Sequence, residues 1–233
     1  MSETRRERQR EATREEIKAT ARRLLAEQGT AGLSIRAIAR EIGLTPPALY
    51  RYFASLDDLV TALIVDVFTA LAEQIEAARD CAGPQAPPSA KLMNVLRAYR
   101  RWAVDNPADF GLIYGTPIAG YHAPREITVP VVIRGFAVIV GLLEEMTQQE
   151  EIIPVPSMQM PPPGVEASLQ AMIEGDGYPV SVAALYMGTV GWTQFHGIIS
   201  LEVFGHLPPV VGDTNAFFEA QLRNILIGMG WKG

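Results

Sequence analysis

The chain has 233 residues and a formal net charge of −6, and its 48% hydrophobic content is enough to bury a core. Its single cysteine, Cys81, excludes an intramolecular disulfide framework, and no metal-binding His or Cys cluster, glycine-rich phosphate loop or G-x-S-x-G is present. We therefore expect no metal, no cofactor and no enzymatic activity, and the lack of an apolar signal segment predicts a cytoplasmic protein.

Charge is distributed unevenly along the chain. From Met1 to Arg51 there are 11 Lys and Arg against 7 Asp and Glu, a net +4, whereas the remainder carries 9 against 19, a net −10. A basic end on an acidic body would orient that end toward a nucleic acid. Residues 1–12 precede any apolar periodicity and are predicted to be flexible, either as a solvated terminus or as an arm whose arginines touch phosphates or the minor groove.

The first predicted helix runs from Thr13 to Gln28. Thr13 and Glu16 have the spacing of a capping box, and Gly29 ends the helix. Its buried face is predicted to comprise Ile17, Ala21, Leu24 and Leu25.

Ser34 to Phe53 reads as two short helices joined by a glycine turn. Ser34 is predicted to cap the first of them, and Gly43 suits a backbone with positive φ at its end. Thr45 is predicted to cap a second helix, Pro46 to Phe53, with Pro46 at its first position. Units of this size place their second helix in a DNA groove, although a compact three-helix core without DNA function uses the same signals.

Further helices follow to the end of the chain. Ser55 and Asp58 are predicted to cap a long helix of about six turns, and the composition of Cys81 to Ser89 is that of a linker. We expect helices over 89–105, 108–116, 124–149, 179–204 and 213–230, and an irregular, proline-rich loop over 152–164. No strand-like alternation of useful length occurs, so the fold class is predicted to be all-α.

The first 60 or so residues resemble the TetR family of bacterial transcriptional regulators. The resemblance rests on Gly29, on the run from Ser34 to Thr45, on Leu49-Tyr50-Arg51-Tyr52-Phe53, and on Ser55 to Leu59. One departure is Leu56, where the family usually has a lysine that contacts phosphate. The run Trp192-Thr193-Gln194-Phe195-His196-Gly197 also resembles a W-x-x-x-H-G signature of one C-terminal subclass of the family.

The resemblance implies a DNA-binding role for one set of side chains. Tyr50 and Tyr52 would bind phosphates, Thr45 would contact the backbone or cap the helix, and Pro47 and Ala48 would face the groove. Arg36 would reach a phosphate or remain a free surface arginine. Because Pro47 and Ala48 offer only apolar contacts, readout of DNA shape gains importance over readout of bases.

The body is expected to hold a small-molecule effector between its helices. His196 lies on one helical face with Trp192, where it would bond a ligand or serve as an ordinary core histidine. Candidate lining residues, which would otherwise simply fill the core, are Tyr99, Trp102, Phe110, Tyr114, Phe136, Met146, Met187, Trp192 and His196.

The last two predicted helices match the four-helix dimerisation arrangement that the resemblance implies. The alternative is that both helices close a monomeric core. Although 179–201 lacks charged residues and is long enough to span a bilayer, its glycines, Gln194 and His196 argue against a membrane segment. The predicted subunit-interface residues are Gly188, Gly191, Phe217, Leu222, Ile225 and Met229.

These features predict a DNA-binding domain over 1–55 and a helical effector-binding and dimerisation domain over 56–233. The expected protein is a homodimeric repressor, released from a near-palindromic double-stranded DNA operator by a small apolar or aromatic effector. Two alternatives remain: a DNA-binding regulator without an effector, and a helical small-molecule-binding protein or enzyme that uses His196.

Overall fold

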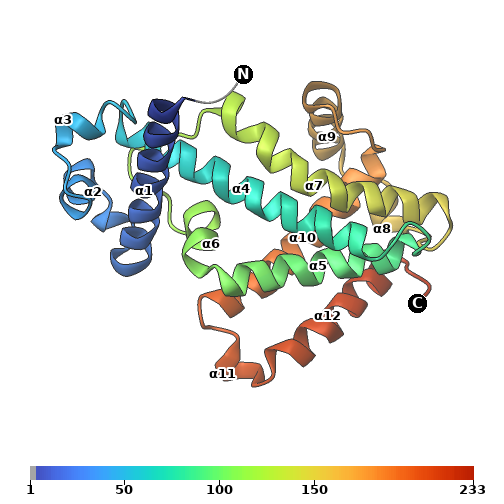
Figure 1. Cartoon of the computed structure of the whole chain (residues 1–233). Helices are drawn as coiled ribbons and strands as arrows, with labels where there is room; N and C mark the ends of the chain where they lie inside the picture. Colours follow the sequence, from blue (N-terminus) through green and yellow to red (C-terminus); the bar gives the residue numbers. More distant parts are fainter. Residues whose placement is uncertain (1–3) are drawn as a thin grey trace. The chain divides into compact units, whose positions relative to one another are not determined.

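The structure is a computed structural model that describes residues 4–233, and within that range it contains helices and turns but no strand (Figure 1). The fold is 76% helical, which confirms the all-α prediction. The longer helices are α1 (Arg5–Gln28), α2 (Ile35–Glu41), α4 (Leu56–Cys81), α5 (Pro88–Asp105), α6 (Pro107–Tyr114), α7 (Arg125–Gln148), α9 (Pro163–Asp176), α10 (Val182–Val203) and α12 (Thr214–Met229). The single-turn helices are η1 (Thr30–Gly32), α3 (Pro46–Leu49), α8 (Pro156–Gln159) and α11 (Pro208–Val211).

The chain forms two compact units. The first comprises the chain up to Val67 together with Asn106–Thr128, and the second comprises Phe68–Asp105 and Val129–Gly233. The predicted boundary between residues 55 and 56 separates a DNA-binding domain from an effector-binding domain. The compact units do not test that functional division, so it stays a prediction.

The first unit is built around α1, which begins eight residues earlier than predicted. The hydroxyl of Thr4 accepts a hydrogen bond from the backbone N–H of Glu7, and the carboxylate of Glu7 accepts one from the backbone N–H of Thr4 at 2.7 Å. This reciprocal capping box starts the helix at Arg5. The expectation that Thr13 caps the helix is therefore wrong, and its hydroxyl instead bonds the carbonyl of Gln9 inside α1. Of residues 1–12, which were predicted to be flexible, residues 1–3 lie outside the described part of the chain, Thr4 caps α1, and residues 5–12 are helical, so the prediction is wrong for 5–12.

The core of the first unit follows the predicted apolar faces. Ile17 and Leu24 of α1 are buried together with Ile38 of α2, Leu49 of α3 and Leu63 of α4. Burial of these side chains packs α2 against α1 and α3 against α2 (Figure 1).

The second unit packs α10 against α5, α9 and α12. The helix α9 was not predicted. It begins with Pro163 at its first turn and ends at Gly177, whose φ of 77° is left-handed. Leu169 packs into a buried cluster with Val140, Tyr178 and Leu185, so α9 covers a core that the sequence pattern did not indicate.

Of the helices that the structure describes, α7 alone is long and apolar enough to cross a membrane by length and composition. Its contacts are those of a helix packed within a domain. Val140 is fully buried in the cluster with Leu169 and Leu185, and Arg134 forms an ion pair with Glu76 at 2.6 Å.

Candidate nucleic-acid interface and effector cavity

Two short helices in the first unit have the geometry of a helix-turn-helix. The hydroxyl of Ser34 accepts from the backbone N–H of Ala37 at 3.1 Å and caps α2, as predicted. Gly43 has φ of 69°, and its N–H and that of Leu44 donate to the carbonyls of Arg40 and Ala39. This Schellman arrangement satisfies the last carbonyls of α2 and turns the chain toward α3.

The second helix is shorter than predicted. Regular α-helix covers Pro46–Leu49, and the N–H groups of Tyr50, Tyr52 and Phe53 continue helical hydrogen bonds as a tight turn. Thr45 occupies the cap position, but its hydroxyl makes no capping hydrogen bond. The capping role predicted for Thr45 is wrong.

The predicted DNA-contacting side chains lie at the surface of this turn. Thr45, Pro47 and Arg36 are exposed, the side chain of Tyr50 is 51% exposed, and Tyr52 and Ala48 are partly exposed. Leu49 and Phe53 are buried in the core. The turn thus presents hydroxyls and small apolar groups outward while two large side chains anchor it, as the sequence predicts.

One arginine ties α1 to the end of this turn. Arg14 Nη1 donates to the carbonyl oxygen of Tyr52 at 2.8 Å, and the Arg14 guanidinium lies 4.4 Å from the centroid of the Phe53 ring. No local sequence signal predicts this contact, because its partners are 38 residues apart. It fixes the position of Tyr52 relative to α1.

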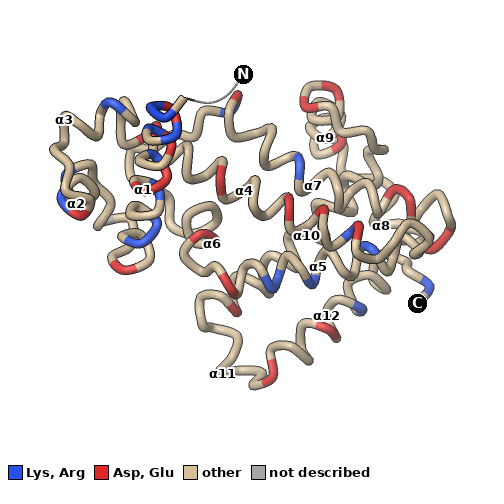
Figure 2. Tube along the Cα trace, in the orientation of Figure 1, with Lys and Arg blue, Asp and Glu red and all other residues tan. Residues whose placement is uncertain are grey.

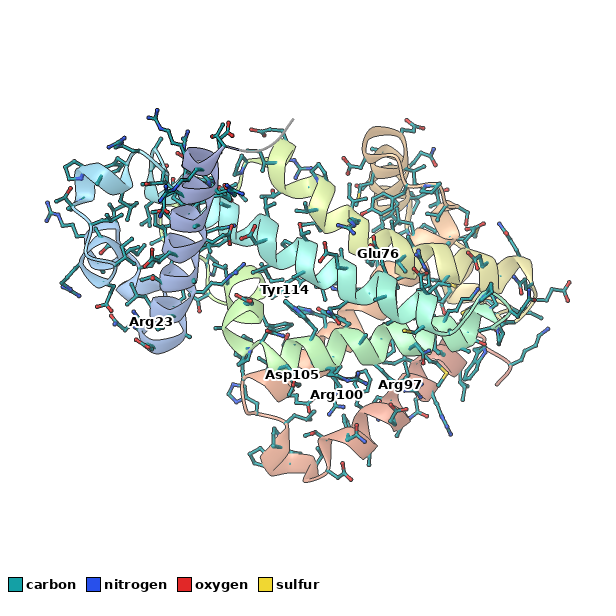
Figure 3. All side chains as sticks on the ribbon, viewed as in Figure 1. Arg23, Glu76, Arg97, Arg100, Asp105 and Tyr114 are labelled. Atoms are coloured by element: carbon teal, nitrogen blue, oxygen red, sulfur yellow. The ribbon has the colours of Figure 1, made fainter. Side chains whose placement is uncertain are left out.

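The electrostatics of α2 are set by one ion pair. Arg23 of α1, labelled in Figure 3, pairs with Glu41 at 2.7 Å and lowers the pKa of that carboxyl through a hydrogen bond. Within residues 4–233, no ion pair engages Arg36, Arg40 or Arg51. Figure 2 shows Lys and Arg positions recurring along α1 and at α2. The first unit therefore offers cations to a polyanion.

The second unit contains a small apolar cavity of about 20 Å³. That is the room of roughly one water molecule. It is lined by Leu92, Leu96, Tyr99, Ile139, Leu143, Gly188, Gly191, Trp192, Phe195, Leu226 and Met229. A ligand larger than water would have to displace side chains such as the flexible Met229.

One lining residue, Tyr99, forms a hydrogen bond with His196, which does not itself line the cavity. The hydroxyl of Tyr99 and Nδ1 of His196 are 2.9 Å apart, and the His196 ring lies beside Trp192 with centroids 5.0 Å apart. Burial lowers the pKa of His196, so the imidazole is neutral near neutral pH.

Of the predicted lining residues, Tyr99 and Trp192 line this cavity, whereas His196 and the others do not. Phe110 and Tyr114 belong to the first unit, where their rings pack 5.3 Å apart. Phe136 packs against Tyr178, and Trp102, Met146 and Met187 are buried without lining the cavity. Aromatic and methionine content alone could not distinguish cavity walls from core.

Comparison with known proteins assigns both parts of the chain. Residues 17–63 match the family model described as "Bacterial regulatory proteins, tetR family", and residues 92–225 match "Tetracyclin repressor-like, C-terminal domain". The HTH-type transcriptional regulator Rv1816 of Mycobacterium tuberculosis is 35% identical over 234 residues, covering 96% of each chain.

Two solved structures share the fold. The putative regulatory protein SCO4313 superposes with a TM-score of 0.75 at 34% identity, covering 96% of this chain and 99% of that one. A Rhodococcus sp. RHA1 protein with unknown function superposes with a TM-score of 0.69 at 22% identity, covering 93% and 95% of the two chains, which shows the fold alone.

Proposed function

The chain belongs to the TetR family of bacterial transcriptional regulators, and on that premise we propose that it is a cytoplasmic, homodimeric repressor released from DNA by a small apolar or aromatic effector. Regulators of this family are generally non-enzymatic, and we assign no catalytic step. The observation that carries the proposal is the helix-turn-helix, whose outward face presents Thr45, Tyr50 and Tyr52 beside arginines that form no ion pair within residues 4–233.

In this proposal the turn after Gly43 inserts α3 into a DNA groove. Tyr50 and Tyr52 donate hydrogen bonds to phosphates, and the Thr45 hydroxyl, which is not used as a cap, reaches the DNA backbone. Pro47 and Ala48 make apolar contacts in the groove, and Arg36 pairs with a phosphate.

Dimerisation is proposed to use exposed faces of α10 and α12. Four of the six predicted interface residues are covered within the subunit, because Leu222 and Met229 are buried while Gly188 and Gly191 face Val140 and Met229. Phe217 and Ile225 are partly exposed. Larger exposed side chains on these helices are Leu201 at 48%, Phe204 at 47% and Ile227 at 56%.

Two-fold symmetry would present two α3 helices to DNA and requires a near-palindromic operator. Effector binding at the cavity beside Tyr99 and His196 would favour a spacing of the DNA-binding units that does not fit the operator. By linkage, effector and operator then weaken each other's binding by the same factor.

A second candidate is a regulator that responds to no small molecule. The cavity of about 20 Å³ favours this candidate, because a well-packed body offers no ready site to an effector. The two are separated by screening small aromatic and aliphatic compounds for thermal stabilisation and then testing each hit against the DNA complex. A tight ligand that leaves DNA affinity unchanged at saturation contradicts the release mechanism for that ligand.

The test of DNA binding is fluorescence anisotropy with the intergenic DNA beside the protein's own gene, against unrelated DNA at two salt concentrations. We expect tighter binding to the intergenic DNA with one dimer per site. The variant Tyr50→Phe should weaken binding to all sequences about fivefold for each subunit that contacts the DNA, since it removes one hydrogen bond of about 1 kcal/mol from each, and should leave thermal stability unchanged. Equal, weak binding of both duplexes would argue against this operator, and a stability loss with unchanged DNA affinity would make Tyr50 structural.

A further inference from the structure

An open basic groove of about 800 Å³ lies in the first unit, outside the residues assigned to the helix-turn-helix contacts except for Tyr52. The first two turns of α1 contribute Arg5, Arg6, Gln9 and Arg10, and the end of the helix-turn-helix contributes Arg51 and Tyr52. Figure 2 shows the Lys and Arg positions at the start of α1. Two segments about 40 residues apart in sequence thus present cations to one space.

The groove has a fixed geometry on both sides. The capping box of Thr4 and Glu7 holds Arg5 to Arg10 in a helix, so these arginines do not belong to a coil. The bond from Arg14 to the carbonyl of Tyr52 and its stacking on Phe53 join the same helix to the opposite wall. The positions of the cations are therefore set by the fold.

The charges of the groove are available to an anion. Within the described residues 4–233, no ion pair engages Arg5, Arg6, Arg10 or Arg51. Among residues 4–233, Glu7 is the one carboxylate that lines the groove, and it accepts hydrogen bonds from the backbone N–H and hydroxyl of Thr4. In the described part of the chain, four cations against one occupied carboxylate make the groove strongly positive.

We propose that this groove binds the sugar-phosphate backbone of DNA beyond the segment that α3 contacts, which rests on the proposed DNA-binding function. Tyr52 joins the two surfaces, because it is both a proposed phosphate contact and a wall of the groove. From Arg5 to Arg10 the helix rises about 7.5 Å, comparable to two base-pair steps of about 3.4 Å. Since guanidinium groups on an open groove meet phosphates rather than base edges, the contact adds affinity without sequence preference.

The chain supplies a matched control. Arg8 lies on the same two turns of α1, is exposed and does not line the groove. Arg10→Ala therefore removes a positive charge at the proposed contact, and Arg8→Ala removes one from the same helix outside the contact. Both residues are exposed, so neither substitution removes core packing.

The experiment measures binding of the full chain to a duplex of unrelated sequence, several helical turns long, over a series of salt concentrations. We expect the triple variant Arg5→Ala, Arg6→Ala, Arg10→Ala to reduce the magnitude of the slope of log affinity against log salt. The reduction should be about 2.7 for each subunit that contacts the duplex, since each phosphate contact contributes about 0.9. Arg10→Ala should reduce the magnitude of the slope by about 0.9, and Arg8→Ala should leave it nearly unchanged.

Each outcome decides the proposal. Equal reductions by Arg8→Ala and Arg10→Ala would mean diffuse charge rather than a groove contact and would overturn it. A triple variant that binds like the parent would also overturn it, while leaving the proposed DNA-binding function intact. A parent that binds no duplex at any salt concentration would overturn both.

Discussion

At the scale of single residues, the contact of the buried Tyr99 with the partly buried His196 couples the second unit to pH. Burial lowers the pKa of His196 in the folded chain, whereas the unfolded chain titrates at its ordinary value of about 6.5. Below that pH the unfolded state binds more protons than the folded state, so the free energy of unfolding falls as pH falls through about 6.5. The folded state gains relative stability as pH rises through the same window.

The variant His196→Gln should isolate this effect. It is expected to cost about 1 kcal/mol at alkaline pH through the lost hydrogen bond to Tyr99. Its deficit relative to the parent should then shrink as pH falls from about 7.5 to 5, because the variant has no imidazole to titrate. Urea unfolding over that pH range measures the difference. Tyr99→Phe is the control, since it removes the same hydrogen bond and keeps the imidazole; a deficit of His196→Gln that is constant with pH would contradict the argument.

Glycine is required at position 188 because neighbouring side chains pack close to its backbone, and not because the backbone conformation demands it. A Cβ built on it would collide with Cγ1 of Val140 and lie 3.5 Å from the Phe136 ring. Gly188→Ala should therefore destabilise the chain by about 1–3 kcal/mol through overpacking. Gly141 lies inside α7 with no atom within 4 Å of such a Cβ, so Gly141→Ala should raise stability by up to about 1 kcal/mol. Thermal unfolding of both variants is the measurement, and changes of the same sign would refute the packing argument.

At the scale of elements, an ionic cluster holds α1 to α4 and α6. Lys18 is only 8% exposed, and its ammonium lies 2.7 Å from Asp66 of α4 and 2.6 Å from Glu15. Burial alone would lower the pKa of Lys18, but hydrogen bonds to both carboxylates raise it and keep the side chain charged. Arg22 bridges Asp66 and Asp109 of α6 at 3.3 and 3.5 Å, while burial raises the pKa of Asp109.

Removing one charge from this cluster should have unequal effects. Asp66→Asn is expected to destabilise the chain by about 2–3 kcal/mol, because it leaves Lys18 nearly buried and Arg22 with a weaker partner. Glu15→Gln, which removes the half-exposed partner of the same Lys18, should cost less than about 1 kcal/mol. Urea denaturation compares the two, and a Glu15→Gln effect as large as that of Asp66→Asn would show that burial does not govern the cluster.

The elements differ in how far the sequence could predict them. The helix-turn-helix was predictable because the Ser34 cap, the positive φ of Gly43 and Pro46 are local signals that coincide. The start of α1 was not, because Thr4 and Thr13 both precede a glutamate by three residues and Arg5 to Glu11 has no apolar periodicity. Apart from Tyr99 and Trp192, the cavity wall was not predicted, because its residues come from α5, α7, α10 and α12. Apolar periodicity indicates that a side chain is buried, but it does not indicate which other helices that side chain contacts.

The sequence contains signals for the helix α9, but the prolines that precede it indicated a loop. Pro163 at its first turn, Leu169 and Ile173 four residues apart, and Gly177 at its end are together typical of a helix. Five prolines between Ile152 and Gly164 made the preceding segment a loop, and that interpretation masked the helix that begins within it.

At the scale of the whole molecule, the proposed dimer makes DNA affinity depend on the subunit interface. In the proposed complex, Pro47 and Ala48 face the groove with only apolar surface, so the helix-turn-helix of one subunit would make few contacts with bases. Joining two such units makes the second binding event intramolecular, which raises overall affinity by about 10² to 10⁴ when both half-sites are engaged. Specific DNA binding should therefore depend on the exposed faces of α10 and α12, far in sequence from the helix-turn-helix.

Ile227→Glu tests this dependence. Ile227 is 56% exposed on α12, so a charge there costs little in an isolated subunit but should oppose an apolar subunit interface. We expect a folded monomer by analytical ultracentrifugation and an affinity for the intergenic DNA at least about 100-fold weaker than the parent's. Val132→Glu, on the exposed side of α7, is the control and should remain dimeric with parental DNA affinity. If Ile227→Glu stays dimeric, the interface lies elsewhere; if it becomes monomeric with undiminished affinity, one subunit suffices for the operator and the two-fold model of recognition fails.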